Sequence, residues 1–125
     1  MAINTMKNGD IRLIGMSLMR VWEESKSDIK LSGTSLYRLL AIKRKIEQQA
    51  SLINEAFVEI GLSLGGEDSG DGQLKIPTDK ISEANERLSE VAAEEFEIEY
   101  TPIELKETDY LPPDLMELFF DFIQI

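Results

Sequence analysis

The feature that most constrains the fold is the apolar pattern of residues 34–63, TSLYRLLAIKRKIEQQASLINEAFVEIGLS. Apolar side chains recur there at spacings of three, four and seven residues, which is typical of an amphipathic helix. Thr34 or Ser35 would cap its first turn. Gly61 or the Gly65–Gly66 pair would end it. We therefore expect one long helix whose apolar stripe comprises Leu36, Leu39, Ile46, Ala50, Ile53, Phe57 and Ile60.

A second helix is predicted over residues 78–95, after the glycine-rich acidic loop LGGEDSGDGQ of residues 64–73. Pro77 precedes it, and proline is common where a helix begins. Two helices joined by a polar loop favour an antiparallel helical hairpin. The apolar stripe of the second helix consists of Ile81, Ala84, Leu88 and Val91.

Residues 96–105 are predicted to form a strand, because apolar and acidic residues alternate at its start. Pro102 interrupts the alternation, and the apolar phase shifts beyond it, which indicates an edge or a bulge. One face of this strand should be buried and the other should carry only carboxylates. The inward set is Phe96, Ile98 and Tyr100, and the outward set is Glu95, Glu97 and Glu99.

The two ends of the chain carry further elements. The segment LPPDLMELFFDFIQI predicts a C-terminal helix over residues 113–123, with Phe119 and Phe122 in the core. Phe120 points away from that pair and is the candidate for a hydrophobic interface. Near the other end, Asn8-Gly9 is the dipeptide best suited to a tight turn with positive φ, preceded by a strand or an extended arm.

These elements predict an α+β fold class: an antiparallel helical hairpin packed with a small β-sheet and a short C-terminal helix. The length of 125 residues suits a single domain, residues 1–125, that buries a real core. The N-terminal MAINTMKNGD lacks the basic-then-apolar order of a signal peptide, and no apolar run is long enough to span a bilayer. We expect no contact with a membrane.

The residue types that carry most catalytic chemistry are missing. The chain has neither cysteine nor histidine, which removes thiolate zinc sites and the commonest general base. Its 24 acidic residues make some carboxylate pair inevitable, so such a pair indicates nothing specific. The loop acids Glu67, Asp68 and Asp71 do not follow the spacing of an EF-hand. We therefore expect a protein that is not an enzyme and needs neither a metal nor a cofactor.

The net charge of −11 is unevenly distributed. Residues 1–66 hold nine basic and seven acidic residues, whereas residues 67–125 hold four basic and seventeen acidic residues. Such an acidic half would repel a polyanion, so direct binding of DNA or RNA is not expected. It permits binding to a basic protein surface, although acidity also simply aids solubility. The candidate partner-binding surface is Glu95, Glu97, Glu99 and Glu104.

A basic cluster lies on the first predicted helix. Arg38, Lys43, Arg44 and Lys45 form a patch, and Tyr37 beside them offers a ring that could stack on a base. One interpretation is a contact for an anion, such as a nucleotide or an acidic protein surface. The favoured interpretation is that the cluster neutralises the acidic helix and strand of the same molecule, across the hairpin or between subunits.

The order of motifs resembles a family of small bacteriophage proteins known only as a domain of unknown function. The likeness covers roughly residues 1–123. It is carried by Leu36-Tyr37, Phe96-Glu97-Ile98, Pro102-Ile103-Glu104-Leu105 and Pro113-Asp114-Leu115, with Asp114 where glutamate is usual. The resemblance implies a phage origin and a similar fold, and it brings no active site.

Three hypotheses for the function follow. The first is a phage-encoded, non-enzymatic inhibitor that binds a basic surface of a host or anti-phage defence protein in the host cell cytoplasm. The second is a virion or assembly component that forms a homo-oligomer through the helical hairpin and the Phe-rich terminus. The third is a sponge for a signalling nucleotide, which Arg38, Lys43 and Arg44 would hold at a subunit interface.

Overall fold

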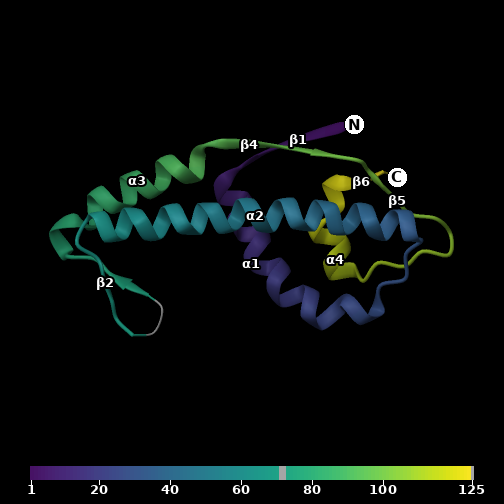
Figure 1. Cartoon of the computed structure of the whole chain (residues 1–125), viewed down its shortest axis with the longest axis horizontal. Helices are drawn as coiled ribbons and strands as arrows, with labels where there is room; N and C mark the ends of the chain where they lie inside the picture. The colour runs from purple at the N-terminus through teal and green to yellow at the C-terminus, as the bar shows by residue number, and fades with distance from the viewer. Residues whose placement is uncertain (71–72, 125) are drawn as a thin grey trace.

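The longest element of the computed structural model, which describes residues 1–70 and 73–124, is helix α2 (Gly33–Ser63). It runs along the long axis of the molecule (Figure 1). The predicted capping residues are wrong, because Ser32 caps the helix by accepting a hydrogen bond from the Ser35 N–H at 3.3 Å. The helix ends where glycine was expected to end it: Gly65 adopts a φ of 84°, and the Gly66 N–H donates to the Gly61 carbonyl at 2.8 Å.

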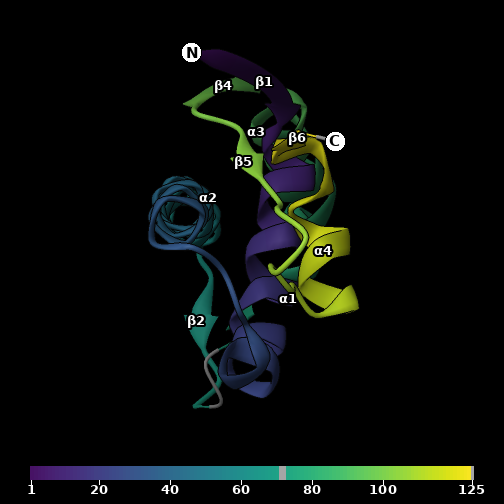
Figure 2. The ribbon, with the colours of Figure 1, turned by 90° about the vertical axis from the view of Figure 1, so that its right-hand side faces the viewer.

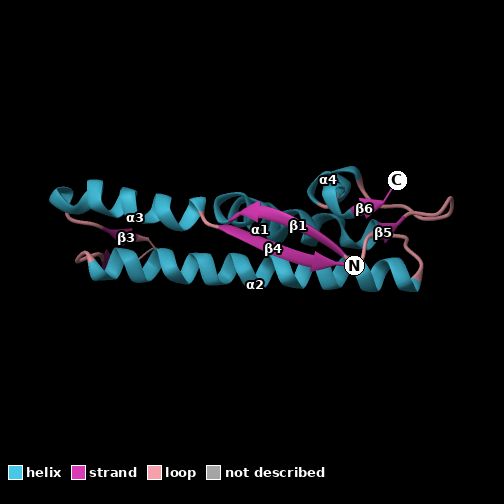
Figure 3. Cartoon of the chain, turned by 90° about the horizontal axis from the view of Figure 1, so that it is seen from above, coloured by secondary structure: helices cyan, strands magenta, loops and turns pink. Residues whose placement is uncertain are grey.

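The predicted antiparallel helical hairpin is confirmed. Helix α3 (Ile81–Ala93) lies beside the C-terminal end of α2 and runs in the opposite direction (Figures 1 and 3). It is shorter than the predicted 78–95, because η2 (Thr78–Lys80) is a 3-10 turn and Glu94 already has extended backbone, with φ −67° and ψ 138°. Between the two helices, a small hairpin pairs β2 (Glu67–Asp68) with β3 (Leu74–Lys75).

A further helix, α1 (Asn8–Ser25), packs against α2, α3 and the C-terminal segment. The predicted turn at Asn8-Gly9 is wrong, because these residues open α1. Asn8 is anchored there instead: its backbone N–H donates to the Glu94 carbonyl at 2.8 Å, and its side chain donates to the Val91 carbonyl at 3.1 Å. The 3-10 turn η1 (Lys26–Asp28) then leads toward α2.

The main sheet pairs the start of the chain with the segment after α3. Strand β1 (Ala2–Lys7) runs antiparallel to β4 (Glu95–Tyr100), with Ala2 opposite Tyr100 and Lys7 opposite Glu95. The predicted alternation of β4 is confirmed, since its glutamates are exposed and Ile98 is 1% exposed. Seen end-on in Figure 2, this sheet lies above α2 and α1.

The predicted strand 96–105 divides in two. Pro102, which cannot donate a ladder hydrogen bond, separates β4 from β5 (Ile103–Glu104). The predicted helix 113–123 is wrong beyond Leu118: α4 (Pro113–Leu118) is followed by the 3-10 turn η3 (Phe120–Phe122) and by β6 (Ile123–Gln124). The change of backbone occurs at Phe119, and it lets β6 pair in parallel with β5.

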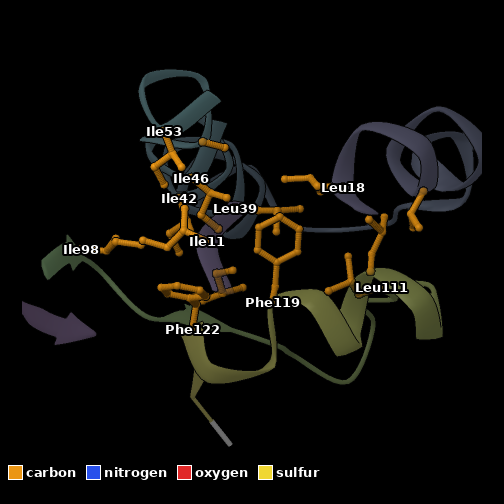
Figure 4. Packing of buried hydrophobic residues seen from close by; sticks show 14 residues of the cluster. Ile11, Leu18, Leu39, Ile42, Ile46, Ile53, Ile98, Leu111, Phe119 and Phe122 are labelled. Carbon is orange, nitrogen blue, oxygen red and sulfur yellow. The ribbon is translucent and has the colours of Figure 1, made fainter. Parts of the chain in front are cut away.

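The core lies where α1, α2, α4 and the inner face of β4 meet. Figure 4 shows the rings of Phe119 and Phe122 pointing from the C-terminal segment toward the aliphatic side chains of the other elements. Both residues are buried, at 0% and 1% exposure, as predicted, and the Phe122 ring meets Tyr100 edge-on with centroids 4.9 Å apart. The cluster also includes Ile11, Leu18, Leu39, Ile42, Ile46, Ile53, Ile98, Ile103, Leu111 and Leu115.

Candidate functional site

The exposed acids of α3 and β4 form one continuous series along the chain. The spacings of three and four residues from Glu83 place the α3 glutamates on one face of the helix, opposite the buried Ala84. Only Glu94 separates α3 from β4 in the chain, and the two elements follow one another along the upper edge of Figure 1. The outward glutamates of β4 continue the series. We call this surface the acidic ridge; it comprises Glu83, Glu86, Glu90, Glu94, Glu95, Glu97 and Glu99.

Few cations balance the acidic ridge. Lys80 approaches Glu83 at 3.9 Å, and both side chains are about half exposed. Lys7 lies across the sheet from Glu95, but no ion pair joins them. Within residues 1–70 and 73–124, six of the seven ridge glutamates therefore have no salt bridge. Arg87, on α3 among these glutamates, donates to the Ser63 hydroxyl at 3.0 Å. Carboxylates gathered with few counter-charges create a negative potential that attracts a basic surface.

Glu104, the fourth predicted acid, lies outside the ridge. It is exposed on β5, beyond Pro102, where the chain has left the β1–β4 sheet. Its backbone carbonyl accepts a hydrogen bond of 2.6 Å from the buried hydroxyl of Ser35, which fixes β5 to the start of α2. Its carboxylate has no salt bridge among the described residues.

The basic cluster of α2 is largely engaged with its own chain. Arg38 donates to the Pro102 carbonyl at 3.1 Å, and Lys45 donates to the Glu99 carbonyl. Lys43 forms a 3.0 Å ion pair with Glu47, and its ammonium also lies 4.7 Å from the centre of the Trp22 ring. The Lys43–Glu47 pair lies within α2, so among the described residues the cluster forms no salt bridge with the predicted acidic helix or strand, and the other two cations bind backbone carbonyls. Arg44 is exposed and has no polar contact within the described residues, and Tyr37 is 75% exposed.

Three adjoining hollows lie between α2 and β4, each of about 270–300 Å³. The first and second share Lys45 and Glu99, and the second and third share Phe96, so together they follow the whole length of β4. We call them the α2–β4 groove. On the helix side the groove is lined mainly by Tyr37, Ala41, Lys45, Gln49, Leu52 and Ala56, and on the strand side by Glu95, Glu97 and Glu99.

Sequence reasoning located the strand half of the ridge and missed the helix half. The signal was present, because Glu83, Glu86 and Glu90 share one face of a predicted helix. No pattern in the sequence predicted the α2–β4 groove. Phe120 is 56% exposed, which agrees with the prediction that it points away from Phe119.

No cluster of three or more candidate ligands for a metal ion forms within the described part of the chain; Asp71, considered as a calcium ligand, lies outside it. None of the helices in residues 1–70 and 73–124 combines the length and apolar character needed to cross a bilayer. Comparison of the chain with protein-family models, with curated proteins and with solved structures finds no match.

Proposed function

We propose that this chain is a non-enzymatic binding protein whose acidic ridge engages a basic surface of another protein. The observation that carries the proposal is the run of seven exposed glutamates from α3 into β4, of which only Glu83 has a cation within ion-pair distance among the described residues. Self-repulsion of this kind works against the compact fold. A surface that only aids solubility has no need to concentrate its acidic residues on two consecutive elements.

The spacing of the ridge favours a partner site that normally accepts phosphates. Residues on one face of a strand repeat at about 6.6–6.8 Å. Helical residues three or four apart on one face are about 4.5–6 Å apart along the axis. Successive phosphates on one DNA strand advance about 3.4 Å each, so alternate phosphates have a comparable spacing. A ridge of this kind can occupy a basic surface shaped for a nucleic acid.

The resemblance to small bacteriophage proteins gives this activity a biological setting. We propose that the partner is a host or anti-phage defence protein with a basic surface, and that binding of the ridge inhibits it in the host cell cytoplasm. Such an inhibitor acts by occlusion, so it requires no catalytic residue, metal or cofactor. Electrostatic attraction would also speed association, and the rate should fall as salt rises.

Charge reversal of the strand part of the ridge tests the proposal. We expect the triple variant Glu95→Lys, Glu97→Lys, Glu99→Lys to lose capture of the partner from host lysate, because three attractive contacts become repulsive. The readout is quantitative mass spectrometry of proteins retained by the tagged chain. The matched control is Glu24→Lys, Glu107→Lys, Glu117→Lys, which makes the same change in net charge at exposed positions outside the ridge.

In the control variant, capture should remain within about twofold of wild type, since long-range effects of net charge are screened at physiological salt. Equal loss in both triple variants would show that net charge alone governs capture. Retention by the ridge variant would contradict the proposal directly.

A virion or assembly role is the second candidate, and one observation favours it. Leu13, Met16 and Met19 on α1 are 60%, 51% and 72% exposed, which is an apolar surface suited to self-association. A homo-oligomer formed through this face would have a solution mass that falls to the monomer value in Met16→Glu, Met19→Glu. Mass spectrometry of purified particles separates the candidates, because an inhibitor should be absent from virions.

A further inference from the structure

We propose that the free edge of β4 is a strand-addition site, which takes an extended basic segment of the partner into the α2–β4 groove. The inference rests on the proposed function, because the segment belongs to the same basic partner. It adds the mode of recognition: backbone pairing along β4, with the glutamates selecting the side chains of the incoming strand.

Alternate residues of β4 direct their backbone groups toward the groove. The Asn8 N–H donates to the Glu94 carbonyl at 2.8 Å, so Asn8 and Glu94 form a hydrogen-bonded pair in the antiparallel ladder. Hydrogen-bonded pairs alternate along such a ladder. The even-numbered residues of β4 therefore bond to β1, and Glu95, Glu97 and Glu99 direct their N–H and C=O groups to the other edge. The hydrogen bond from Lys45 to the Glu99 carbonyl agrees with this assignment.

The edge of β4 that faces the groove is open. In the described residues, β4 pairs with β1 and with no other strand. The N–H and C=O groups of Glu97 and the N–H of Glu99 have no partner there, and only the Glu99 carbonyl is capped, by Lys45. Proteins usually protect such edges with proline, with lysine or with a covering element. Strand β4, of sequence EFEIEY, contains neither proline nor lysine.

The helix wall of the groove offers a surface for an added strand to cover. Tyr37, Ala41 and Lys45 lie one helical turn apart, and Leu52 and Ala56 continue the same side of α2. Tyr37 is 75% exposed and Leu52 is 56% exposed. Small and apolar side chains on this wall favour apolar residues at those positions of an incoming strand that face α2.

The charge of β4 identifies the occupant of the groove. Side chains directly opposite one another on neighbouring strands interact, and like charges there are destabilising. Glu95, Glu97 and Glu99 all point to the solvent face, so an added strand is favoured when it carries lysine or arginine at alternate positions. A second copy of β4 would place glutamates against glutamates. The occupant is therefore a partner segment that alternates basic and apolar residues.

The test uses a short, fluorescently labelled peptide of alternating lysine and valine, and measures its binding by anisotropy. We expect Lys45→Ala to tighten binding by about three- to tenfold, because it frees the Glu99 carbonyl and removes a like charge from the groove. Arg44→Ala is the control: it deletes the same charge one residue away, outside the residues that line the groove. Equal affinity changes in the two variants would overturn strand addition.

Backbone pairing is tested with two N-methylated forms of the same peptide, one methylated at the lysines and one at the valines. Alternate N–H groups of a strand point to opposite edges. One form should therefore bind at least about tenfold more weakly, while the other should keep most of its affinity. Loss in the lysine-methylated form indicates antiparallel addition, and loss in the valine-methylated form indicates parallel addition. Equal affinity of the two forms would overturn the inference.

These outcomes are separate from the test of the proposed function. The ridge triple variant could lose both the partner and the peptide while the wild-type chain binds the two methylated peptides equally. In that case the acidic ridge binds by charge alone, and strand addition is overturned. If the wild-type chain does not bind the lysine–valine peptide at all, strand addition is overturned, whereas capture of the partner still decides the proposed function.

Discussion

Replacing Phe119 with alanine is expected to lower the free energy of unfolding by about 3–5 kcal/mol. Phe119 is 0% exposed, and Figure 4 shows its ring directed toward Leu18 and Leu39, which belong to α1 and α2. Truncation removes the contacts that join the C-terminal segment to both helices and leaves a cavity that these helices cannot easily fill. Urea denaturation followed by circular dichroism measures the change.

The neighbouring residue supplies the control for this experiment. Phe120 is 56% exposed, so Phe120→Ala should change the free energy of unfolding by no more than about 0.5 kcal/mol. The two variants delete the same atoms at adjacent positions, and only burial differs between them. Similar losses of stability in both would show that the C-terminal segment does not dock in the way described.

Elements with a clear local period were predicted well from the sequence. The stripe of α2 repeats over 31 residues, and the helix was predicted within one residue of its observed bounds. The alternation in β4 fixed which side chains of the strand point outward, because one buried face specifies the orientation of all its residues. Both predictions depend only on neighbours in the sequence.

The errors arose where distant segments decide the local backbone. Asn8-Gly9 has the composition of a turn, but hydrogen bonds from Asn8 to Val91 and Glu94, more than eighty residues away, hold it at the start of α1. The C-terminal helix was predicted to continue to residue 123. Pairing of Ile123 with Ile103 and burial of Phe119 and Phe122 end the helix earlier. Tertiary contacts outweighed the turn propensity of Asn8-Gly9 and the helical propensity of the C-terminal segment.

The candidate site also has one part that the sequence predicts and one part that it does not. The glutamates of the ridge are visible in the sequence once a helix and a strand are assigned. The α2–β4 groove is not, because its walls come from segments about fifty residues apart, and its open edge depends on which neighbour β4 pairs with. The interpretation of Lys45 differs most between sequence and structure. In the sequence it belongs to a basic cluster, whereas in the structure its ammonium donates to the Glu99 carbonyl at the groove-facing edge of β4.

Replacing Gly15 with alanine is expected to lower the free energy of unfolding by about 1–3 kcal/mol. The usual effect of this substitution inside a helix is opposite, because alanine is favoured over glycine by about 0.5–1 kcal/mol. At this position an added Cβ would lie 2.7 Å from the Cβ of Ala50, where α1 and α2 approach each other. Carbon atoms pack best at about 3.5–4.0 Å, so the two helices would have to separate.

A second substitution identifies this close approach as the cause. In the double variant Gly15→Ala, Ala50→Gly, the added methyl group of one helix enters the space vacated on the other. The double variant should therefore be more stable than the sum of the two single changes predicts, by about 1 kcal/mol or more. Gly33→Ala is the control, because a Cβ there meets nothing within 4 Å and should raise stability by about 0.4–1 kcal/mol. If Gly15→Ala stabilises the protein as Gly33→Ala does, α1 and α2 do not approach each other as closely as described. The position of the helix wall of the groove would then also differ from the one described.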